Sequence, residues 1–388
     1  MPTIVDHRAA IAVTRGPRFH FHGYYDKTPW DPSGRYIAAL ETGFIDRPPQ
    51  GADEAVVGLI DTELDNAWSP LATTRAWNWQ QGSMIHWIDP NADAAFVHND
   101  ARGGKLVSVV RSLAGEELRV LPRPVYSVSL DGAQAVTLNF ARVHRTRPGY
   151  GYHATPDATA GDPCPDDDGI WHMDMATGES RLIVTLAQIA ATRPKPNMAG
   201  AEHWFNHLLF SRDGSRFIFL HRWKLASGGW ETRLFTANPD GSNVCLLADH
   251  EIVSHFDWRG SDHVLAWARH HDVGDRFFLY GDQSDDRAVI GDGTLTRDGH
   301  CSYSPDRRWV LNDAYPNRDN HRTLMLYRPE DDTRVDVGEF YTMPEMGGEI
   351  RCDLHPRWSR DGTKICFDST HEGERQVYVM DVADIVNA

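Results

Sequence analysis

The 388-residue chain is 41% hydrophobic and 24% charged, which is typical of a globular protein with a sizeable core and too polar for an integral membrane protein. Its formal net charge of −16 disfavours nucleic acid or an anionic membrane as a partner, because like charges repel over about 10 Å at moderate salt. The five cysteines form no CxxC pair and no apolar leader is present, so we expect a reduced, cytoplasmic protein.

One phrase, a turn of the Ser/Asp-Pro-Asp-Gly type followed by an aromatic or β-branched strand, recurs along the chain. Its seven copies begin at Asp31, Asp89, Ser129, Ser211, Arg259, Ser304 and Ser359. A second phrase, in which a polar turn joins two strands, lies between successive copies. Two hairpins per unit form a four-stranded sheet that cannot bury both faces alone, and radial stacking of such sheets buries them.

The repeat therefore predicts an all-β fold, a seven-bladed β-propeller, as a single domain over residues 1–388. A β-sandwich with repetitive hairpins is the alternative. The last copy, QVYVMDV from Gln376, lacks a partner phrase, and a strand around residues 11–14 is expected to complete its sheet. Rim insertions are predicted around residues 141–168 and 186–205, with a short helix near residues 186–191. Insertions between blades usually lie on one rim, where propellers bind ligands.

Three histidines share one register, four residues before a turn phrase. They are His255 in VSHFDW, His300 in DGHCSYSP and His355 in RCDLHPRW. Inner strands line the channel of a propeller, so these side chains should project toward one region. The structural alternative is that each is a buried histidine that bonds neighbouring strands.

The segment around His355 carries further candidate metal ligands. Asp353 and His355 are predicted to share one face of a strand, with Cys352 on the other face. Two imidazoles and a carboxylate suit a divalent ion such as Mn²⁺ or Zn²⁺, whereas entry of Cys352 at a β-bulge would favour Zn²⁺. The residues thus leave Mn²⁺ and Zn²⁺ open, with Ca²⁺ as a further candidate.

The second half of the chain resembles the oligogalacturonate lyases. The order TRLFTANPDGSN, SHFDW, GHCSYSPD and LHPRWSRDGTKICFDSTHEG follows that family over about 150 residues, whereas the first half shares mainly the propeller repeat. The resemblance implies a seven-bladed propeller that cleaves short pectic oligouronides in the bacterial cytoplasm by metal-assisted β-elimination. It also implies catalytic roles for Arg233 and His255 and manganese-ligating roles for His300 and His355. This chain departs from the family at Asp353, where a second histidine is usual, and at Ile350, which replaces a glutamine.

A looser resemblance connects the chain to propeller lyases that act on ulvan, whose site uses histidine, tyrosine and arginine. Tyr150 or Tyr152 of RPGYGY is the candidate tyrosine. The other candidate substrate-binding residues are His22 in FHFHGYYDK, and His221 and Arg222 in FLHRWK.

These residue types suit elimination at a uronic acid. The proton at C5 lies α to a carboxylate and becomes acidic when a metal ion or guanidinium neutralises that carboxylate. Because an ordinary imidazole has a pKa near ~6.5, it can accept this proton at working pH. We assign the base to His255, one carboxylate clamp to a metal at His300 and His355, and a second clamp to Arg233. An arginine base ranks second.

The predicted partner is an anionic oligosaccharide, without nucleic acid or membrane, and the oligomeric state is not encoded in any motif. Two other functions fit the same pattern. One is a propeller glycoside hydrolase that removes a sugar linked to glucuronate, using His22, and the other is a noncatalytic binding propeller. No P-loop, glycine-rich dinucleotide motif, HExxH or GxSxG sequence occurs to support other enzyme classes.

Overall fold

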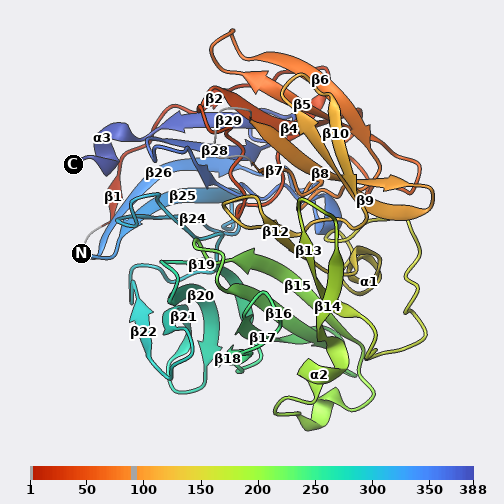
Figure 1. Cartoon of the computed structure of the whole chain (residues 1–388). Coiled ribbons are helices and arrows are strands. Elements are labelled where there is room, and N and C mark those ends of the chain that lie inside the picture. The colour runs from red at the N-terminus through yellow and green to blue at the C-terminus, as the bar shows by residue number, and fades with distance from the viewer. Residues whose placement is uncertain (1–2, 89–93) are drawn as a thin grey trace.

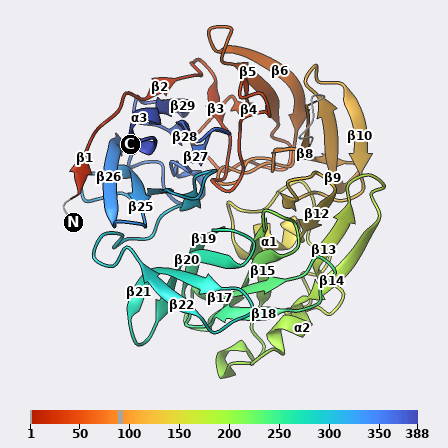
Figure 2. The same cartoon turned by 60° about the vertical axis from the view of Figure 1, so that its left-hand side comes forward.

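A computed structural model describes residues 3–88 and 94–388 of the chain. These residues form seven β-sheets arranged in a ring, as Figures 1 and 2 show from two directions. The predicted seven-bladed β-propeller is therefore confirmed, and the sandwich alternative is excluded. The turn phrase that begins at Asp89 falls within residues 89–93 and lies outside the described residues.

The first four blades follow one another along the chain, each with its strands in sequence order. Blade 1 comprises β3 (Phe19–Phe21), β4 (Tyr36–Thr42), β5 (Ala55–Asp61) and β6 (Ala67–Thr74). Blade 2 comprises β7 (His86–Trp87), β8 (Ala95–Arg102), β9 (Lys105–Ser112) and β10 (Glu117–Leu121). Blade 3 comprises β11 (Ser127–Val128), β12 (Gln134–Thr137), β13 (Gly169–Asp174) and β14 (Ser180–Thr185). Blade 4 comprises β15 (His203–Phe210), β16 (Phe217–Lys224), β17 (Trp230–Ala237) and β18 (Cys245–Ala248).

The remaining blades include the two N-terminal strands. Blade 5 comprises β19 (Val253–Trp258), β20 (His263–His270), β21 (Gly274–Gly281) and β22 (Arg287–Ile290). Blade 6 comprises β23 (Ser302–Tyr303), β24 (Val310–Asp313), β25 (His321–Arg328), β26 (Thr333–Tyr341) and β1 (Ile4–Val5). Blade 7 comprises β27 (Arg357–Trp358), β28 (Lys364–Ser369), β29 (Gln376–Asp381) and β2 (Ile11–Ala12). The described helical segments are α1 (Phe140–Thr146), α2 (Leu186–Ala190), α3 (Ala383–Val386) and the 3₁₀ turns η1 (Pro196–Met198) and η2 (Gly348–Ile350).

The N-terminus closes the ring. β2 pairs antiparallel with β29, with Ile11 opposite Val379, and thereby becomes the fourth strand of blade 7. The closure expected from the unpaired last repeat is confirmed, and it covers an edge that would otherwise be exposed. β1 adds a fifth strand to blade 6 by pairing parallel to β26, which the repeat pattern did not predict.

The recurring turn phrase has a simple physical basis. In the turn of blade 7, the Ser359 hydroxyl donates a hydrogen bond of 2.6 Å to Asp361, and Gly362 adopts a positive φ of 74°. A residue with a side chain is strained in that conformation, which explains the glycine. The turns that begin at Ser211 and Ser304 contain the same serine–aspartate bond.

The repeat also gives the ring two different faces. Each turn phrase follows the inner strand of its blade, so the turns gather at one face, which we call the lower face. The segments that precede the inner strands gather at the opposite, upper face. The connection from β12 to β13, which contains α1, and the connection from β14 to β15, which contains α2, also belong to the upper face. The helix expected near residues 186–191 is α2, whereas α1 was not predicted.

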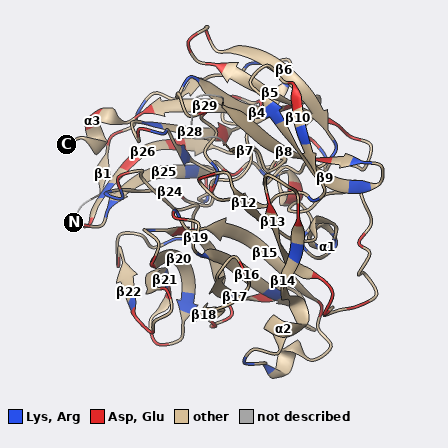
Figure 3. Ribbon diagram, in the orientation of Figure 1, with Lys and Arg blue, Asp and Glu red and all other residues tan. Residues whose placement is uncertain are grey.

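Acidic and basic residues are interspersed over the blades (Figure 3). Several form exposed ion pairs, such as Arg276 with Asp292 at 3.0 Å, which contribute little to stability individually. Within residues 3–88 and 94–388, no helix is both long enough and apolar enough to cross a membrane.

Candidate functional site

The three histidines that share a register meet at the upper end of the central channel. The ring centroids of His255 and His300 lie 4.1 Å apart, and those of His300 and His355 lie 4.4 Å apart. All three side chains are buried, and they come from the inner segments of blades 5, 6 and 7. The convergence predicted from the register is therefore confirmed, and we call these residues the histidine cluster.

Carboxylates orient two of the three imidazoles. Nδ1 of His300 lies 2.9 Å and 3.0 Å from the two carboxylate oxygens of Asp313, and Nδ1 of His255 lies 2.9 Å from Asp298. An Nδ1–H that donates to a carboxylate leaves Nε2 as the unprotonated nitrogen of a neutral ring. In the described structure Nε2 of His300 is buried without a hydrogen-bond partner, so its lone pair is available to a metal ion or a proton.

Asp353 and His355 complete a possible metal site but do not lie on a strand. Residues 351–356 are irregular, and His355 has a positive φ of 42°, so the predicted strand is wrong at this point. Pro356 explains the difference, because proline has no N–H to donate and sheet pairing begins only at Arg357. Even so, single ligand atoms of His300, Asp353 and His355 all lie within 4.8 Å of one another.

The donor set fits a divalent transition ion. Both ring nitrogens of His355 are buried and have no hydrogen-bond partner among the described residues. Burial, followed by the charge of His300, holds the pKa of His355 well below its ordinary value, so its imidazole stays neutral and able to bind a metal. Two ligands on one small ion lie at most roughly 4.2 Å apart, so the three ligand atoms need only a small inward movement.

Asp353 is the charged member of this donor set. Arg322 contacts one of its oxygens at 2.6 Å and Arg351 contacts the other at 2.7 Å. Burial opposes ionisation, but the two arginines, Arg351 first, hold the pKa of Asp353 well below its ordinary value. Asp353 is therefore ionised at neutral pH. It could bind a metal ion while Arg322 and Arg351 remain in contact with its oxygens.

Cys352 lies outside the group of residues that could hold a metal ion. The group whose ligand atoms converge consists of His300, Asp353 and His355 and does not include Cys352. Burial raises the pKa of the Cys352 thiol to about 11, so it is protonated at neutral pH, whereas a metal requires the thiolate. The irregular backbone at Asp353 does not bring the sulfur into the site.

Aromatic side chains surround the histidine cluster. Tyr24 stacks on His207, with ring centroids 4.9 Å apart, and meets His355 edge-on at the same distance. Tyr25 lies 5.3 Å from His300, and its hydroxyl donates to the carbonyl of Phe256. Sequence reasoning singled out the phrase FHFHGYYDK only for its histidines and missed both tyrosines.

Of the two candidate tyrosines, Tyr150 is the one beside the cluster. Its hydroxyl accepts a 2.5 Å hydrogen bond from Arg351, and its ring lies edge-on to His207 at 5.5 Å. Tyr152 is fully buried, stacks on Phe140 at 4.4 Å and accepts a hydrogen bond from Asn99. The structure thus places Tyr152, the predicted substrate contact, in the core of blade 3.

Two neighbouring residues on β16 face opposite sides of blade 4. His221 pairs in register with Arg233 on β17, so these two share one face, and Arg222 points to the other face. Arg222 is buried in an environment that includes Tyr24, Tyr150 and Arg147; burial, with a contribution from Arg147, lowers the pKa of Arg222 to about 10. Burial first and the charge of Arg222 second lower the pKa of His207, the residue on which Tyr24 stacks.

Arg233 is bound to a different part of the blade. Its guanidinium donates to the carbonyls of Ile189, Thr192 and Arg193 at 2.9, 2.7 and 3.2 Å and to Nδ1 of His221 at 3.1 Å. These contacts join β17 to the connection that contains α2. The pairing register puts Arg233 and His221 on the face of blade 4 opposite to Arg222. The structure therefore does not bring either residue to His255.

His22 also lies outside the cluster. Its Nδ1 lies 2.8 Å from the carbonyl oxygen of Ala38, and its backbone N–H donates to Asp368. Burial holds the pKa of His22 well below its ordinary value, so it is a neutral residue that bonds neighbouring strands. This arrangement matches the structural role weighed for single histidines of the repeat.

No protein-family model and no curated protein matches this sequence. Solved structures of similar fold include an oligogalacturonate lyase in complex with manganese, at 15% identity and a TM-score of 0.68 over 98% of this chain and 95% of that one. An oligogalacturonate lyase from Vibrio parahaemolyticus is 14% identical, with a TM-score of 0.66 over 98% of this chain and 96% of that one. The β-propeller domain of the Trilobed protease from Pyrococcus furiosus is 10% identical, with a TM-score of 0.52 over 95% of each chain. The resemblance to oligogalacturonate lyases is therefore confirmed for the fold of the whole ring.

Proposed function

We propose that this chain is a lyase that cleaves short oligosaccharides containing uronic acid by metal-assisted β-elimination. The observation that carries the proposal is the convergence of His255, His300 and His355 beside the carboxylate of Asp353. The fold shared with oligogalacturonate lyases, one of them described as a manganese complex, supports the same reaction class. The proposed substrate is anionic, as the sequence predicts.

His300, Asp353 and His355 would hold the divalent ion. Two imidazoles and one carboxylate suit Mn²⁺ or Zn²⁺ better than Ca²⁺, which prefers a shell of oxygen ligands, and Mn²⁺ remains our first choice. When bound, the ion supplies positive charge that neutralises the uronate carboxylate and acidifies the proton at C5. Asp313 fixes the ring of His300 so that Nε2 faces the other ligands.

His255 is our candidate for the base. Asp298 accepts the Nδ1–H of His255, so Nε2 carries the lone pair that can accept the proton from C5. The negative charge of Asp298 also stabilises the imidazolium that forms after proton transfer.

Arg222 takes the clamping role that the sequence analysis gave to Arg233. Arg222 is near His207, Tyr24 and Tyr150, whereas Arg233 donates its hydrogen bonds to backbone carbonyls and to His221. A guanidinium that binds the substrate carboxylate through two parallel hydrogen bonds would stabilise the developing enolate.

The decisive experiment is turnover of galacturonate and glucuronate oligomers by the full chain with Mn²⁺. The unsaturated product of elimination absorbs in the ultraviolet, and His255→Gln should lower kcat by about 10²- to 10⁴-fold because it removes the base. The matched control is His263→Gln, a partly exposed histidine on β20, which should retain full activity. Unchanged activity in His255→Gln would exclude His255 as the base.

Two other results would replace the proposal altogether. Release of a reducing sugar without an unsaturated product would identify a glycoside hydrolase. Absence of both turnover and stoichiometric metal would identify a binding propeller.

A further inference from the structure

A second polar pocket lies at the lower end of the central channel. Two inner segments pass from the histidine cluster to this pocket: Tyr25, which lies beside His300, precedes Lys27, and His255 precedes Asp257. Because all inner strands run from the upper to the lower face, the pocket opens away from the histidine cluster. It consists of two adjoining hollows of about 310 and 210 Å³. We call it the lower pocket, and its members shared by both hollows include Asp26, Lys27, Thr28, Arg212, Asp257 and Arg360.

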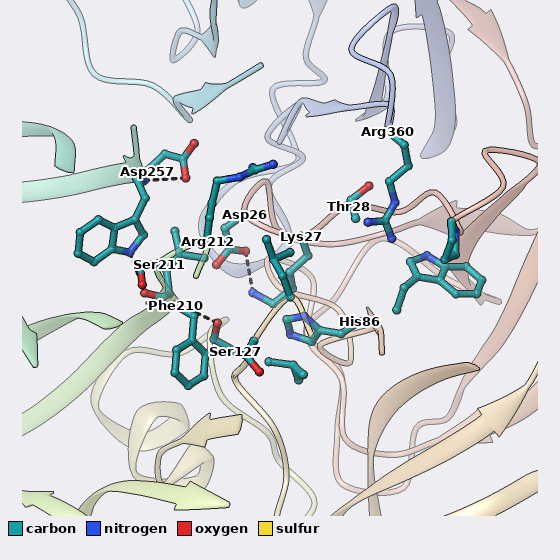
Figure 4. Close-up of a pocket in the computed structure, with 17 residues that line it drawn as sticks. Asp26, Lys27, Thr28, His86, Ser127, Phe210, Ser211, Arg212, Asp257 and Arg360 are labelled. Atoms are coloured by element: carbon teal, nitrogen blue, oxygen red, sulfur yellow. Dashed lines mark hydrogen bonds and ion pairs between the residues drawn. The ribbon is translucent and has the colours of Figure 1, made fainter. Parts of the chain in front are cut away.

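Basic side chains enter the lower pocket from several parts of the ring. Figure 4 shows Lys27, Arg212 and Arg360 around it, and Arg307 lines the adjoining hollow. Two carboxylates, Asp26 and Asp257, face these four cations. The pocket therefore carries an excess of positive charge inside a chain whose net charge is −16.

Both carboxylates already have partners. Asp26 contacts Nζ of Lys27 at 2.6 Å. Asp257 accepts the backbone N–H groups of Tyr303 and Trp258 at 2.7 and 2.8 Å. The aspartates of the neighbouring turns accept bonds from serine hydroxyls of their own turns, namely Asp31, Asp213, Asp306 and Asp361. The acidic groups around the pocket are thus engaged.

The arginines, in contrast, keep unused donors. In the described part of the chain the exposed guanidinium of Arg212 forms no hydrogen bond with the protein, and Nη2 of Arg307 is buried without a partner. Arg360 uses only Nε, which donates to the carbonyl of Trp30 at 3.0 Å. Burial lowers the pKa of Arg360, and the like charge of Arg212 adds to this effect against the opposing influence of Asp31.

Two hydroxyl groups add further unused donors. The Oγ1 atom of Thr28 and the Oγ atom of Ser302 are buried without hydrogen-bond partners in the described structure, and both residues line the lower pocket. A buried polar atom without a partner destabilises the folded chain, so a set of them at one place favours a ligand that supplies acceptors.

We propose that the lower pocket binds a phosphate group, either as the free ion or as part of a small phosphate ester. Phosphate offers several acceptor oxygens and two negative charges, which match the planar donors of Arg212, Arg307 and Arg360. The hydroxyls of Thr28 and Ser302 provide additional donors. A cavity of about 310 Å³ lies at the lower end of the range for small-molecule sites. This proposal is independent of the lyase function.

The test is calorimetric titration of the full chain with inorganic phosphate and, separately, with glucose 6-phosphate, at an ionic strength kept constant with sodium chloride. The double variant Arg212→Gln/Arg360→Gln should bind about tenfold more weakly or worse, because two charge-assisted contacts are lost. Arg308→Gln, which changes an exposed arginine in the same turn as Arg307, should bind as the unaltered chain does. Tighter binding of the ester than of inorganic phosphate would identify the ester as the ligand, and equal binding would identify the free ion.

Equal affinity in all three proteins would overturn the proposal, and so would undetectable binding of both phosphate probes. A binding heat that titration with sodium chloride reproduces would also overturn it, since screening of like charges would then suffice. Crystals soaked in tungstate, a heavy analogue of phosphate, should show density between Arg212 and Arg360. The His255→Gln variant should bind phosphate normally, which separates this test from that of the lyase activity.

Discussion

Two of the buried histidine groups in the described part of this propeller differ in their hydrogen bonding. In the first, the histidine cluster, Nε2 of His300 and both ring nitrogens of His355 have no hydrogen-bond partner in the described structure. In the second, on blade 4, Arg233 donates to Nδ1 of His221, and Nε2 of His221 then donates to Nδ1 of His203 at 2.9 Å. Nε2 of His203 ends the series at the carbonyl of Met198.

The comparison shows that residue type and burial do not identify a functional site. Both groups contain fully buried histidines, and in both burial is the largest cause of a lowered histidine pKa. The second group uses its ring nitrogens to bond neighbouring segments, so no lone pair remains for a ligand. The first group leaves such lone pairs beside a carboxylate, at a cost that a bound ion would remove.

The strongest test of this difference is Arg233→Met. The substitution leaves three carbonyls and one imidazole nitrogen without their donor, so we expect the free energy of unfolding to fall by about 3 kcal/mol or more. Urea denaturation measures this loss, while the activity per folded molecule should remain unchanged.

Arg222→Met is the matched variant from the adjacent strand. It breaks one hydrogen bond, to Thr232, and should change stability by only about 1 kcal/mol while lowering the rate of elimination. An inactive but fully stable Arg233→Met would reverse the roles of the two arginines and restore the assignment made from the sequence.

A second, smaller effect is expected when the first group loses its orienting carboxylate. Asp313→Asn removes the charge that fixes the ring of His300, so the affinity for Mn²⁺ should fall by about 10- to 100-fold. Titration of the ion followed by electron paramagnetic resonance reports this directly, without an activity assay. Asp292→Asn, at an exposed carboxylate of blade 5, is the control and should bind Mn²⁺ normally. Equal affinity in both variants would contradict the orienting role of Asp313 at the ring of His300.

The fold and the meeting of the histidines were predictable from the sequence because both depend on the repeat. The turn phrase fixes where each inner strand ends, and a constant spacing to that turn fixes which residues lie at the upper face. His255, His300 and His355 each stand four residues before a turn, which sufficed to place them together. The unpaired last strand likewise predicted the closure by β2.

The finer parts of the site depend on details that the repeat does not encode. The choice between Arg222 and Arg233 follows from a one-residue alternation on β16 and from its register with β17. The fold of the long connection after β12 puts Tyr150 beside the histidine cluster and buries Tyr152 against Phe140. No local sequence pattern specifies that fold. Asp298 could have been recognised from the sequence as a carboxylate near the histidine cluster, because it stands two residues before His300. Asp313 is more distant in the sequence, and no local pattern indicated that it would contact His300.

The smallest expected effect is the contribution of the second group to stability in acid. Burial, followed by the charge of Arg233, holds the pKa of His221 well below its ordinary value, so His221 stays neutral in the folded chain. In the unfolded chain it takes up a proton near its ordinary pKa of ~6.5. Its contribution to stability is therefore complete above about pH 6.5 and falls by at most about 1.4 kcal/mol for each pH unit below that value.

His221→Gln should remove this contribution and flatten the dependence of the unfolding free energy on pH between about pH 6.5 and pH 5. Denaturant unfolding at several pH values measures the slope, and His7→Gln, at an exposed position, should leave it unchanged. Other buried histidines also destabilise the chain in acid, but they contribute equally to both variants and cancel in the difference. A slope in His221→Gln equal to that of the unaltered chain would mean that protonated His221 is tolerated beside Arg233, and the second group would then no longer count as a fixed structural unit.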